Sequence, residues 1–202
     1  MKIYEYEGKN SEELILKALK ELDVKDDELV YKIEEETIGL FKKNKKKLIV
    51  ALKSDILNYS KRYVKDIVEG MGLKLSIESK RMENYILLKL NSDNNSVLIG
   101  KNGRTLNSLQ TLVRQSIFTK TGLFVNIILD VGDYKEKHQR SIEYLAKKLA
   151  KEVIQTQIEI KMDSMNSYER RLVHEILKNY KGVKTESEGE EPNRCVVIKP
   201  SK

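Results

Sequence analysis

The chain of 202 residues is 40% hydrophobic and 34% charged, and its 38 Lys and Arg outnumber its 31 Asp and Glu. This hydrophobic share excludes a wholly disordered chain, and 2 Pro without a Gly/Ser-rich tract exclude collagen-like and low-complexity classes. A single cysteine excludes an internal disulfide framework, and no apolar run approaches the ~20 residues of a membrane helix. We therefore expect a soluble, basic, cytoplasmic protein.

The net charge of +7 is unevenly distributed along the chain. Residues 1–53 hold 12 Lys and 12 acids, residues 54–131 hold 11 Lys/Arg and 7 acids, and residues 132–202 hold 15 Lys/Arg and 12 acids. No arginine precedes Arg62, and arginine suits phosphate because its planar fork makes paired hydrogen bonds. The distribution favours a polyanionic partner for the last three quarters of the chain, nucleic acid before membrane.

Residues 1–53 predict a small β-α-β-β module. Residues 2–6 alternate as in a strand, and Ser11 is the expected cap of a helix with apolar residues at helical spacing, Leu14, Ile15, Ala18, Leu19 and Leu22. Strands are expected at 29–33 and 47–52, joined by a polar stretch with Gly39 and five lysines between Lys42 and Lys47. These lysines suit nucleic acid or acidic lipid headgroups, but the nearby Glu34–Glu36 favour a solvated hairpin tip.

Residues 54–132 predict the order α-β-β-α-α-β. From Asp55 an apolar stripe at helical spacing follows, formed by Ile56, Tyr59, Tyr63, Val64, Ile67, Val68 and Met71. Strands are expected at 73–80 and 84–91, then a short segment up to Ile99. A helix ended by Gly122 follows, and a strand at 123–131; the expected buried face of this helix is Leu106, Leu109, Leu112, Val113 and Ile117.

The loop Gly100-Lys101-Asn102-Gly103 between two helices is the first candidate for function. Two glycines three residues apart let the backbone bend sharply and approach another backbone closely. The N-terminus of the next helix favours an anion, and Lys101 and Arg104 add positive charge at the same place. The loop therefore suits a phosphodiester chain as its ligand, and a tight helix–helix turn without a ligand is the alternative.

Residues 133–202 predict the order α-β-α-β-β. A helix is expected at 133–157, a strand at 158–162, a helix from its cap Ser167 to about Tyr180, and strands at 183–188 and 194–199. The expected buried face of the first helix is Ile142, Leu145, Ala146, Leu149, Ala150, Val153 and Ile154. A polar turn at 189–193 joins the two closing strands.

Arg170 and His174 are the second candidate, because they lie one helical turn apart on the same face. That face borders the expected buried arc, so the two side chains would be held rigidly while their polar tips stay reachable. Such a pair suits a phosphate, with a forked guanidinium and a donating ring nitrogen. An Arg and a His that only hydrogen-bond within a small domain are the alternative.

The element order over about residues 55–131, with the G-x-x-G loop in place, resembles the KH domain in its type II arrangement. In that family the loop clamps the backbone of single-stranded RNA or DNA. The resemblance implies that Gly100, Lys101, Asn102 and Gly103 grip phosphates. It also implies that three apolar residues before the loop line a groove for the bases, namely Val97, Leu98 and Ile99.

The pair Arg170 and His174 resembles the R-x-x-x-H domain that binds single-stranded nucleic acid, and residues 185–200 resemble the closing hairpin of the bacterial Jag family, also called KhpB or EloR. That family carries a Jag module, a KH domain and an R-x-x-x-H domain in the order read here. The resemblance implies nucleic-acid contacts by Arg170 and His174, with weaker flanking contacts from Arg171, Asn193 and Arg194.

We therefore expect an α+β protein of three small modules: an N-terminal module at 1–53, a type II KH domain at 54–132 and a C-terminal R-x-x-x-H domain at 133–202. The expected function is non-enzymatic binding of single-stranded RNA, without catalytic residues, metal or cofactor. By resemblance, such a protein is an RNA chaperone or post-transcriptional regulator tied to cell elongation and division. The resemblance also implies a small single-KH partner and a membrane-associated assembly reached through the N-terminal module.

Four alternatives stay open from the sequence. The chain is an adaptor for a membrane-associated partner, with incidental nucleic-acid binding, or it is a nuclease or nucleotide hydrolase. Its C-terminal domain binds single-stranded DNA instead of RNA. Its oligomeric state, including a homodimer, is not fixed by any motif.

Overall fold

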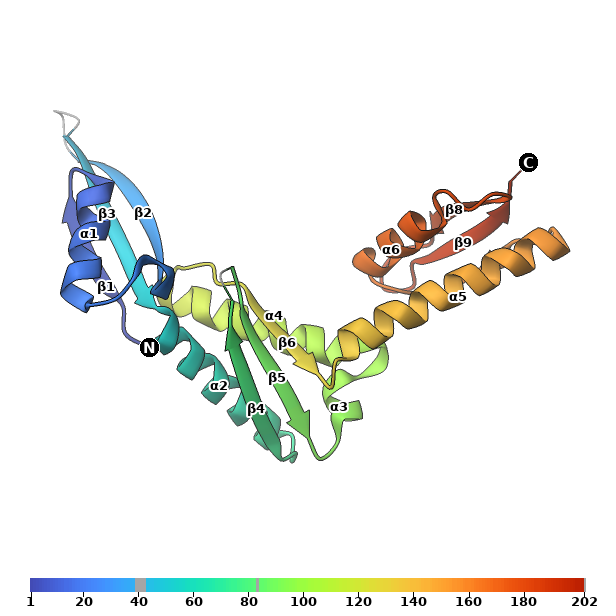
Figure 1. Ribbon diagram of the computed structural model, residues 1–202, viewed down its shortest axis with the longest axis horizontal. Coiled ribbons are helices and arrows are strands. Elements are labelled where there is room, and N and C mark those ends of the chain that lie inside the picture. Colours follow the sequence, from blue (N-terminus) through green and yellow to red (C-terminus); the bar gives the residue numbers. More distant parts are fainter. Residues whose placement is uncertain (39–42, 83, 202) are drawn as a thin grey trace. The chain divides into compact units, whose positions relative to one another are not determined.

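The chain is built from small three-stranded sheets, each packed against its own helices (Figure 1). The computed structural model describes residues 1–38, 43–82 and 84–201. Its contacts group the chain into two compact units, Met1–Gly132 and Asp133–Lys202. The predicted α+β class and the predicted order of helices and strands are confirmed. The division of the first unit at residue 53 stays a prediction.

The first sheet has the strand order β1-β3-β2, with both pairings antiparallel. It contains β1 (Tyr4–Gly8), β2 (Leu29–Ile38) and β3 (Lys43–Leu52), and α1 (Ser11–Leu22) packs against β1 and β3. A short 3-10 turn, η1 (Asp26–Glu28), precedes β2. The buried core of this part is Tyr6, Leu14, Ala18, Leu29, Leu48 and Val50.

Both β2 and β3 extend further toward the hairpin tip than predicted. The acids of β2 lie opposite lysines of β3 in the strand register, with Glu34 facing Lys47 and Glu35 facing Lys46. Opposite charges across a strand pair favour pairing, so a stretch that is polar in sequence continues as strand. The predicted loop residues Gly39–Lys42 lie outside the described residues.

The lysines of this basic stretch are paired with acids. Lys45 contacts Glu7, the Nζ atom of Lys46 lies 3.0 Å from the Glu35 carboxylate, and that of Lys47 lies 2.9 Å from the Glu5 carboxylate. These ion pairs neutralise the lysines on the sheet, which favours the solvated-hairpin interpretation over a free basic patch.

Both predicted helix caps are wrong by one residue. The side chain of Asn10, rather than Ser11, accepts the hydrogen bond from the Glu12 backbone N–H at the start of α1. The side chain of Asn166, rather than Ser167, caps the later helix by accepting from the Glu169 N–H. Asn and Ser are comparable cap residues, so the sequence alone does not decide between neighbours.

The second sheet has the order β4-β5-β6, with β4 antiparallel and β6 parallel to the central strand. The elements are α2 (Lys53–Gly70), β4 (Leu75–Arg81), β5 (Ile86–Ser92), α3 (Asn95–Ile99), η2 (Lys101–Gly103), α4 (Arg104–Thr121) and β6 (Ile127–Val131). Alternate residues of β5 and β6 are buried beneath α2 and α4. Leu112 of α4 is 49% exposed, so its predicted burial is wrong.

The third sheet has the order β7-β9-β8 and is antiparallel. The elements are α5 (Tyr134–Thr156), β7 (Ile160–Lys161), α6 (Ser167–Leu177), β8 (Val183–Glu188) and β9 (Cys195–Pro200). Leu145 of α5 is 40% exposed, contrary to the prediction, whereas Cys195 is buried. The core between α5, α6 and the sheet includes Ala146, Ala150, Val153, Val173, Leu177, Val196 and Ile198.

Candidate nucleic-acid interface

The G-x-x-G loop makes a sharp turn between α3 and α4 that needs its glycines. Gly100 has φ 69° and ψ 179°, a backbone conformation that is essentially restricted to glycine. A Cβ at Gly100 would lie 2.1 Å from Oγ1 of Thr105, so the first turn of α4 already fills the place of a side chain. Asn102 and Gly103 are both left-handed, with φ 52° and 71°. The predicted sharp bend is confirmed.

The loop exposes its charged side chains and buries part of its backbone. Lys101 and Arg104 are exposed, Asn102 is half-buried and Gly103 is buried. Within the described residues neither Lys101 nor Arg104 forms an ion pair, in contrast to the lysines of β3. The glycines therefore set the backbone path, and the two cations are available to an anion.

The N-terminus of α4 lacks the features that neutralise the other helix starts. Its N-cap residue, Gly103, has no side chain to accept a hydrogen bond, and its first turn contains no acid. Of the six α-helices in the described part of the chain, α4 alone lacks both a side-chain cap and a first-turn acid. Unsatisfied N–H groups and the positive end of the helix dipole favour an anion at such an end.

The three apolar residues before the loop do not share one environment. Val97 is 42% exposed and Ile99 is half-buried, so both have accessible surface next to the loop. Leu98 is 0% exposed, because α3 packs against α4 and turns this side chain into the core. The expectation that Leu98 lines a groove is therefore wrong, and its role is packing.

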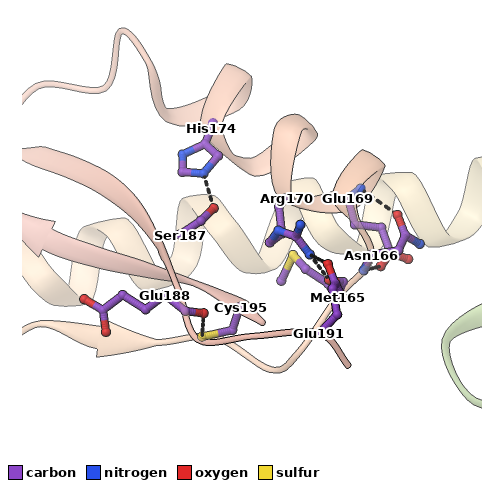
Figure 2. Close-up of polar contacts among 9 residues, drawn as sticks. All are labelled: Met165, Asn166, Glu169, Arg170, His174, Ser187, Glu188, Glu191 and Cys195. Atoms are coloured by element: carbon purple, nitrogen blue, oxygen red, sulfur yellow. Dashed lines mark hydrogen bonds and ion pairs between the residues drawn. The ribbon is translucent and has the colours of Figure 1, made fainter. Parts of the chain in front are cut away.

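Arg170 of α6 is buried rather than reachable. Its side chain and backbone are together 7% exposed, and its Nη1 donates to the Met165 carbonyl and to Oε1 of Glu191, each at 2.8 Å (Figure 2). Glu191 comes from the turn between β8 and β9, 21 residues further along the chain. A buried guanidinium requires such partners because its desolvation is costly. The predicted accessibility of the Arg170 tip is wrong.

His174 is engaged on both ring nitrogens. Its Nδ1 lies 2.7 Å from the Thr185 hydroxyl, and its Nε2 lies 2.8 Å from the Ser187 hydroxyl, both on β8 (Figure 2 shows Ser187). Burial, and next the positive charge of Arg170, lower the pKa of His174 below its usual 6.5. The imidazole is therefore neutral at pH 7. The motif pair thus braces α6 against the hairpin, and its role in binding stays a prediction.

The lowered pKa of His174 predicts that the second unit loses stability in acid. Unfolded His174 binds a proton below pH 6.5, whereas the folded imidazole stays neutral to a lower pH. The unfolded state then binds more protons, so the free energy of unfolding falls as the pH drops from about 7.5 to about 5. Urea unfolding followed by circular dichroism measures this change. His174→Gln should be less acid-sensitive than the parent, and equal sensitivity would contradict the assignment.

The three residues predicted to flank the pair are exposed. Arg171 and Arg194 have no ion pair within the described residues, and Asn193 lies in the turn, where its N–H donates to the Glu190 carbonyl at 2.8 Å. The hairpin around them is acidic: residues 183–194 contain four Glu against one Lys and one Arg. The carboxylates of Glu186 and Glu188 converge on Lys199 at 2.6 and 2.8 Å, and they raise its pKa.

Sequence reasoning missed a buried contact that joins α5 to α6. Glu169 is 5% exposed, accepts the Asn166 N–H at 2.9 Å and lies 2.7 Å from Nε2 of His138 on α5. Tyr134 stacks on this histidine, with ring centroids 5.0 Å apart. The spacing of Asn166 and Glu169 is that of a capping box, which was the available signal.

Within residues 1–38, 43–82 and 84–201, no three His, Cys, Asp or Glu side chains are placed so that they could hold a metal ion. The helices of those ranges include none with the length and apolar character of a membrane span. Cys195 is buried, with its Sγ 3.8 Å from the Glu188 carbonyl.

Comparison with known proteins places both candidate sites in recognised domains. Residues 60–128 match the KH domain family of KhpA/KhpB, and residues 140–200 match the R-x-x-x-H domain family. The chain is 34% identical over 196 residues to "RNA-binding protein KhpB" of Clostridium symbiosum, which covers 95% of this chain and 88% of that protein. It is 32% identical over 199 residues to the protein of that name in Bacillus subtilis, covering 95% of each. It is 36% identical over 136 residues to that of Lactiplantibacillus plantarum, covering 67% of this chain and 42% of the relative.

Proposed function

The chain belongs to the KhpB (Jag) family, and on this premise we propose that it is a non-enzymatic protein that binds single-stranded RNA. The observation that carries the proposal lies at the loop before α4. Two unpaired cations, Lys101 and Arg104, stand there beside a helix start with neither a side-chain cap nor an acid. The printed names of the relatives, which call them RNA-binding, support a nucleic-acid backbone as the anion.

The loop binds the strand through its backbone. Lys101 and Arg104 neutralise neighbouring phosphates, and the first N–H groups of α4 donate to a phosphate oxygen. Gly100 and Gly103 set the path of the turn, while Asn102 occupies its left-handed position. Val97 and Ile99 supply apolar contact for bases. Because no aromatic residue lies in the loop to stack on a base, we expect modest sequence preference.

The R-x-x-x-H domain extends the contact along the same strand. We assign three modules to residues 1–53, 54–132 and 133–202, so that only a short connection separates the two nucleic-acid-binding modules. Binding at one raises the effective concentration at the other, and two weak contacts then give useful affinity. Arg170 and His174 act by holding the hairpin and α6 in place, and the exposed Arg171, Asn193 and Arg194 provide contacts to the strand.

The finer expectations rest on family resemblance. They are pairing with a small single-KH protein and RNA regulation tied to cell elongation and division. Docking of the N-terminal module through free basic charge is less favoured, because Lys45, Lys46 and Lys47 are already paired with acids.

The test is the salt dependence of RNA binding by the full chain. Each phosphate neutralised on a single strand contributes about −0.7 to the slope of log affinity against log salt, so Lys101 and Arg104 alone require at least about −1.4. Fluorescence anisotropy of a labelled single-stranded RNA measures the slope, with a duplex of the same sequence as the control and the weaker ligand. A slope near zero would contradict the proposal. Cleavage of the RNA after incubation with a divalent metal would contradict the absence of enzymatic activity.

A further inference from the structure

The long helix α5 presents one face to its own unit and the opposite face to solvent. The elements α6, β8 and β9 lie along one side of α5 (Figure 1), where Ala146, Ala150 and Val153 are buried. On the opposite side, at 100° per residue, six exposed residues form what we call the outer face. These residues are Lys137, Arg140, Tyr144, Lys147, Lys148 and Lys151.

The outer face carries the positive charge of the second unit. Residues 134–156 contain six Lys/Arg and three acids, a balance of +3. Residues 133–202 contain 15 Lys/Arg and 12 acids, also a balance of +3, so the remainder of the unit is neutral. The hairpin at 183–194 is acidic, with four Glu against two cations. A polyanion is therefore attracted to α5 rather than to the hairpin that contacts Arg170 and His174.

Two lysines of the outer face have free charge. Arg140 is paired with Glu136 and Lys147 with Glu143, each one turn earlier on the helix. Lys148 and Lys151 have no ion pair within the described residues. Both lie on the same side of α5 as Tyr144, one and two turns further along the helix.

Tyr144 is an exposed aromatic side chain among these cations. It is 71% exposed, with no hydrogen bond or ring contact to any described residue. An aromatic ring beside a basic groove or stripe is the arrangement on which single-stranded nucleic acids stack their bases while lysines follow the phosphates. The outer face has both parts within one stretch of about 16 Å, the rise from Arg140 to Lys151.

We propose that the outer face of α5 binds single-stranded RNA, with Lys148 and Lys151 on phosphates and Tyr144 stacked on a base. The inference rests on the proposed RNA-binding function and adds a surface to it. An anionic membrane suits the face less well. A helix that lies in a membrane needs an apolar side to insert, and the apolar side of α5 is packed against its own sheet.

The experiment compares RNA binding of full-length variants with matched charge. Lys148→Gln/Lys151→Gln should make the salt slope of single-stranded RNA binding shallower by about 1.4, because two phosphate contacts are lost. Lys178→Gln/Lys181→Gln removes the same charge from exposed positions of the same unit and should leave the slope unchanged. Tyr144→Leu should weaken binding about 5- to 100-fold, whereas Tyr144→Phe keeps the ring and should bind like the parent.

The outcomes separate this inference from the proposed function. If the parent binds no RNA, the proposed function fails. If the parent binds and the two lysine pairs have equal effects, the outer face is not a specific contact and the inference is overturned. It is also overturned if Tyr144→Leu binds like the parent, or if Lys148→Gln/Lys151→Gln keeps its RNA affinity and loses binding to phosphatidylserine vesicles. Unchanged thermal unfolding midpoints show that these exposed substitutions preserve the fold.

Discussion

Changing Lys101 and Asn102 together to Asp should weaken the affinity for single-stranded RNA by at least about 100-fold, which corresponds to about 2.7 kcal/mol. The double substitution removes one cation and places two carboxylates where the phosphates are proposed to bind. Because α4 has no acid in its first turn, the substitution brings negative charge to an end of the helix that had none. Fluorescence anisotropy with a labelled single-stranded RNA measures the loss.

The same substitution should not destabilise the protein. Asn102 has φ 52°, and Asp accepts this left-handed conformation about as well as Asn. Two carboxylates next to the N-terminus of α4 also interact favourably with the helix dipole, by up to about 1 kcal/mol each. The variant should therefore unfold at the same or a higher denaturant concentration than the parent. Weaker binding with unchanged or greater stability cannot be explained by misfolding.

The matched control places the same charge at the far end of the same helix. Thr119→Asp/Lys120→Asp also changes the charge by three, about 25 Å away at 1.5 Å per residue, which exceeds the screening length of about 8 Å at physiological salt. Both positions are exposed. This variant should keep most of the affinity and lose a little stability, because acids oppose the dipole at a helix C-terminus. Equal loss of binding in both variants would refute a local contact at the loop.

The sequence was sufficient for the order of elements because the signals are local. Helical spacing of apolar residues, and the left-handed glycine at Gly122, place the helices and their ends. It was insufficient for the width of the buried faces. Leu112 and Leu145 lie at the edges of their apolar stripes, and whether another element covers such an edge depends on the tertiary fold.

The candidate sites differ in the same way. The G-x-x-G loop is a local feature, so its turn and its exposed cations followed from four or five adjacent residues. The environment of Arg170 depends on Glu191, 21 residues away in a turn whose position helical spacing does not specify. Local reasoning placed the Arg170 side chain at the margin of the core and could not indicate that an acid covers it.

Gly100→Ala should lower the free energy of unfolding of the first unit by about 3 kcal/mol. The backbone at Gly100 is in a region where a side chain costs about 1–3 kcal/mol. The added Cβ would in addition lie 2.1 Å from Oγ1 and 3.0 Å from the backbone N of Thr105. Denaturant unfolding of the full chain, followed by circular dichroism, measures the effect.

Two other glycines separate strain from overlap. Gly70, in α2, has no positive φ, and an added Cβ there would meet no atom within 4 Å, so Gly70→Ala should be neutral or gain up to about 1 kcal/mol. Gly72 has the same free space but φ 80°, so Gly72→Ala should lose about 1 kcal/mol from backbone strain alone. The expected order of stability is therefore Gly70→Ala, then Gly72→Ala, then Gly100→Ala.

Thr105→Ala in the Gly100→Ala background then assigns the cause. Removing the hydroxyl relieves the 2.1 Å overlap but leaves the strained φ and the approach to the backbone N, so it should restore only part of the lost stability. Full restoration would mean that overlap alone requires the glycine. No restoration would mean that φ alone does. Partial restoration makes Gly100 a residue that fixes how α4 leaves the loop, and RNA binding should then fall with stability in Gly100→Ala, unlike in the Lys101→Asp/Asn102→Asp variant, where binding falls and stability does not.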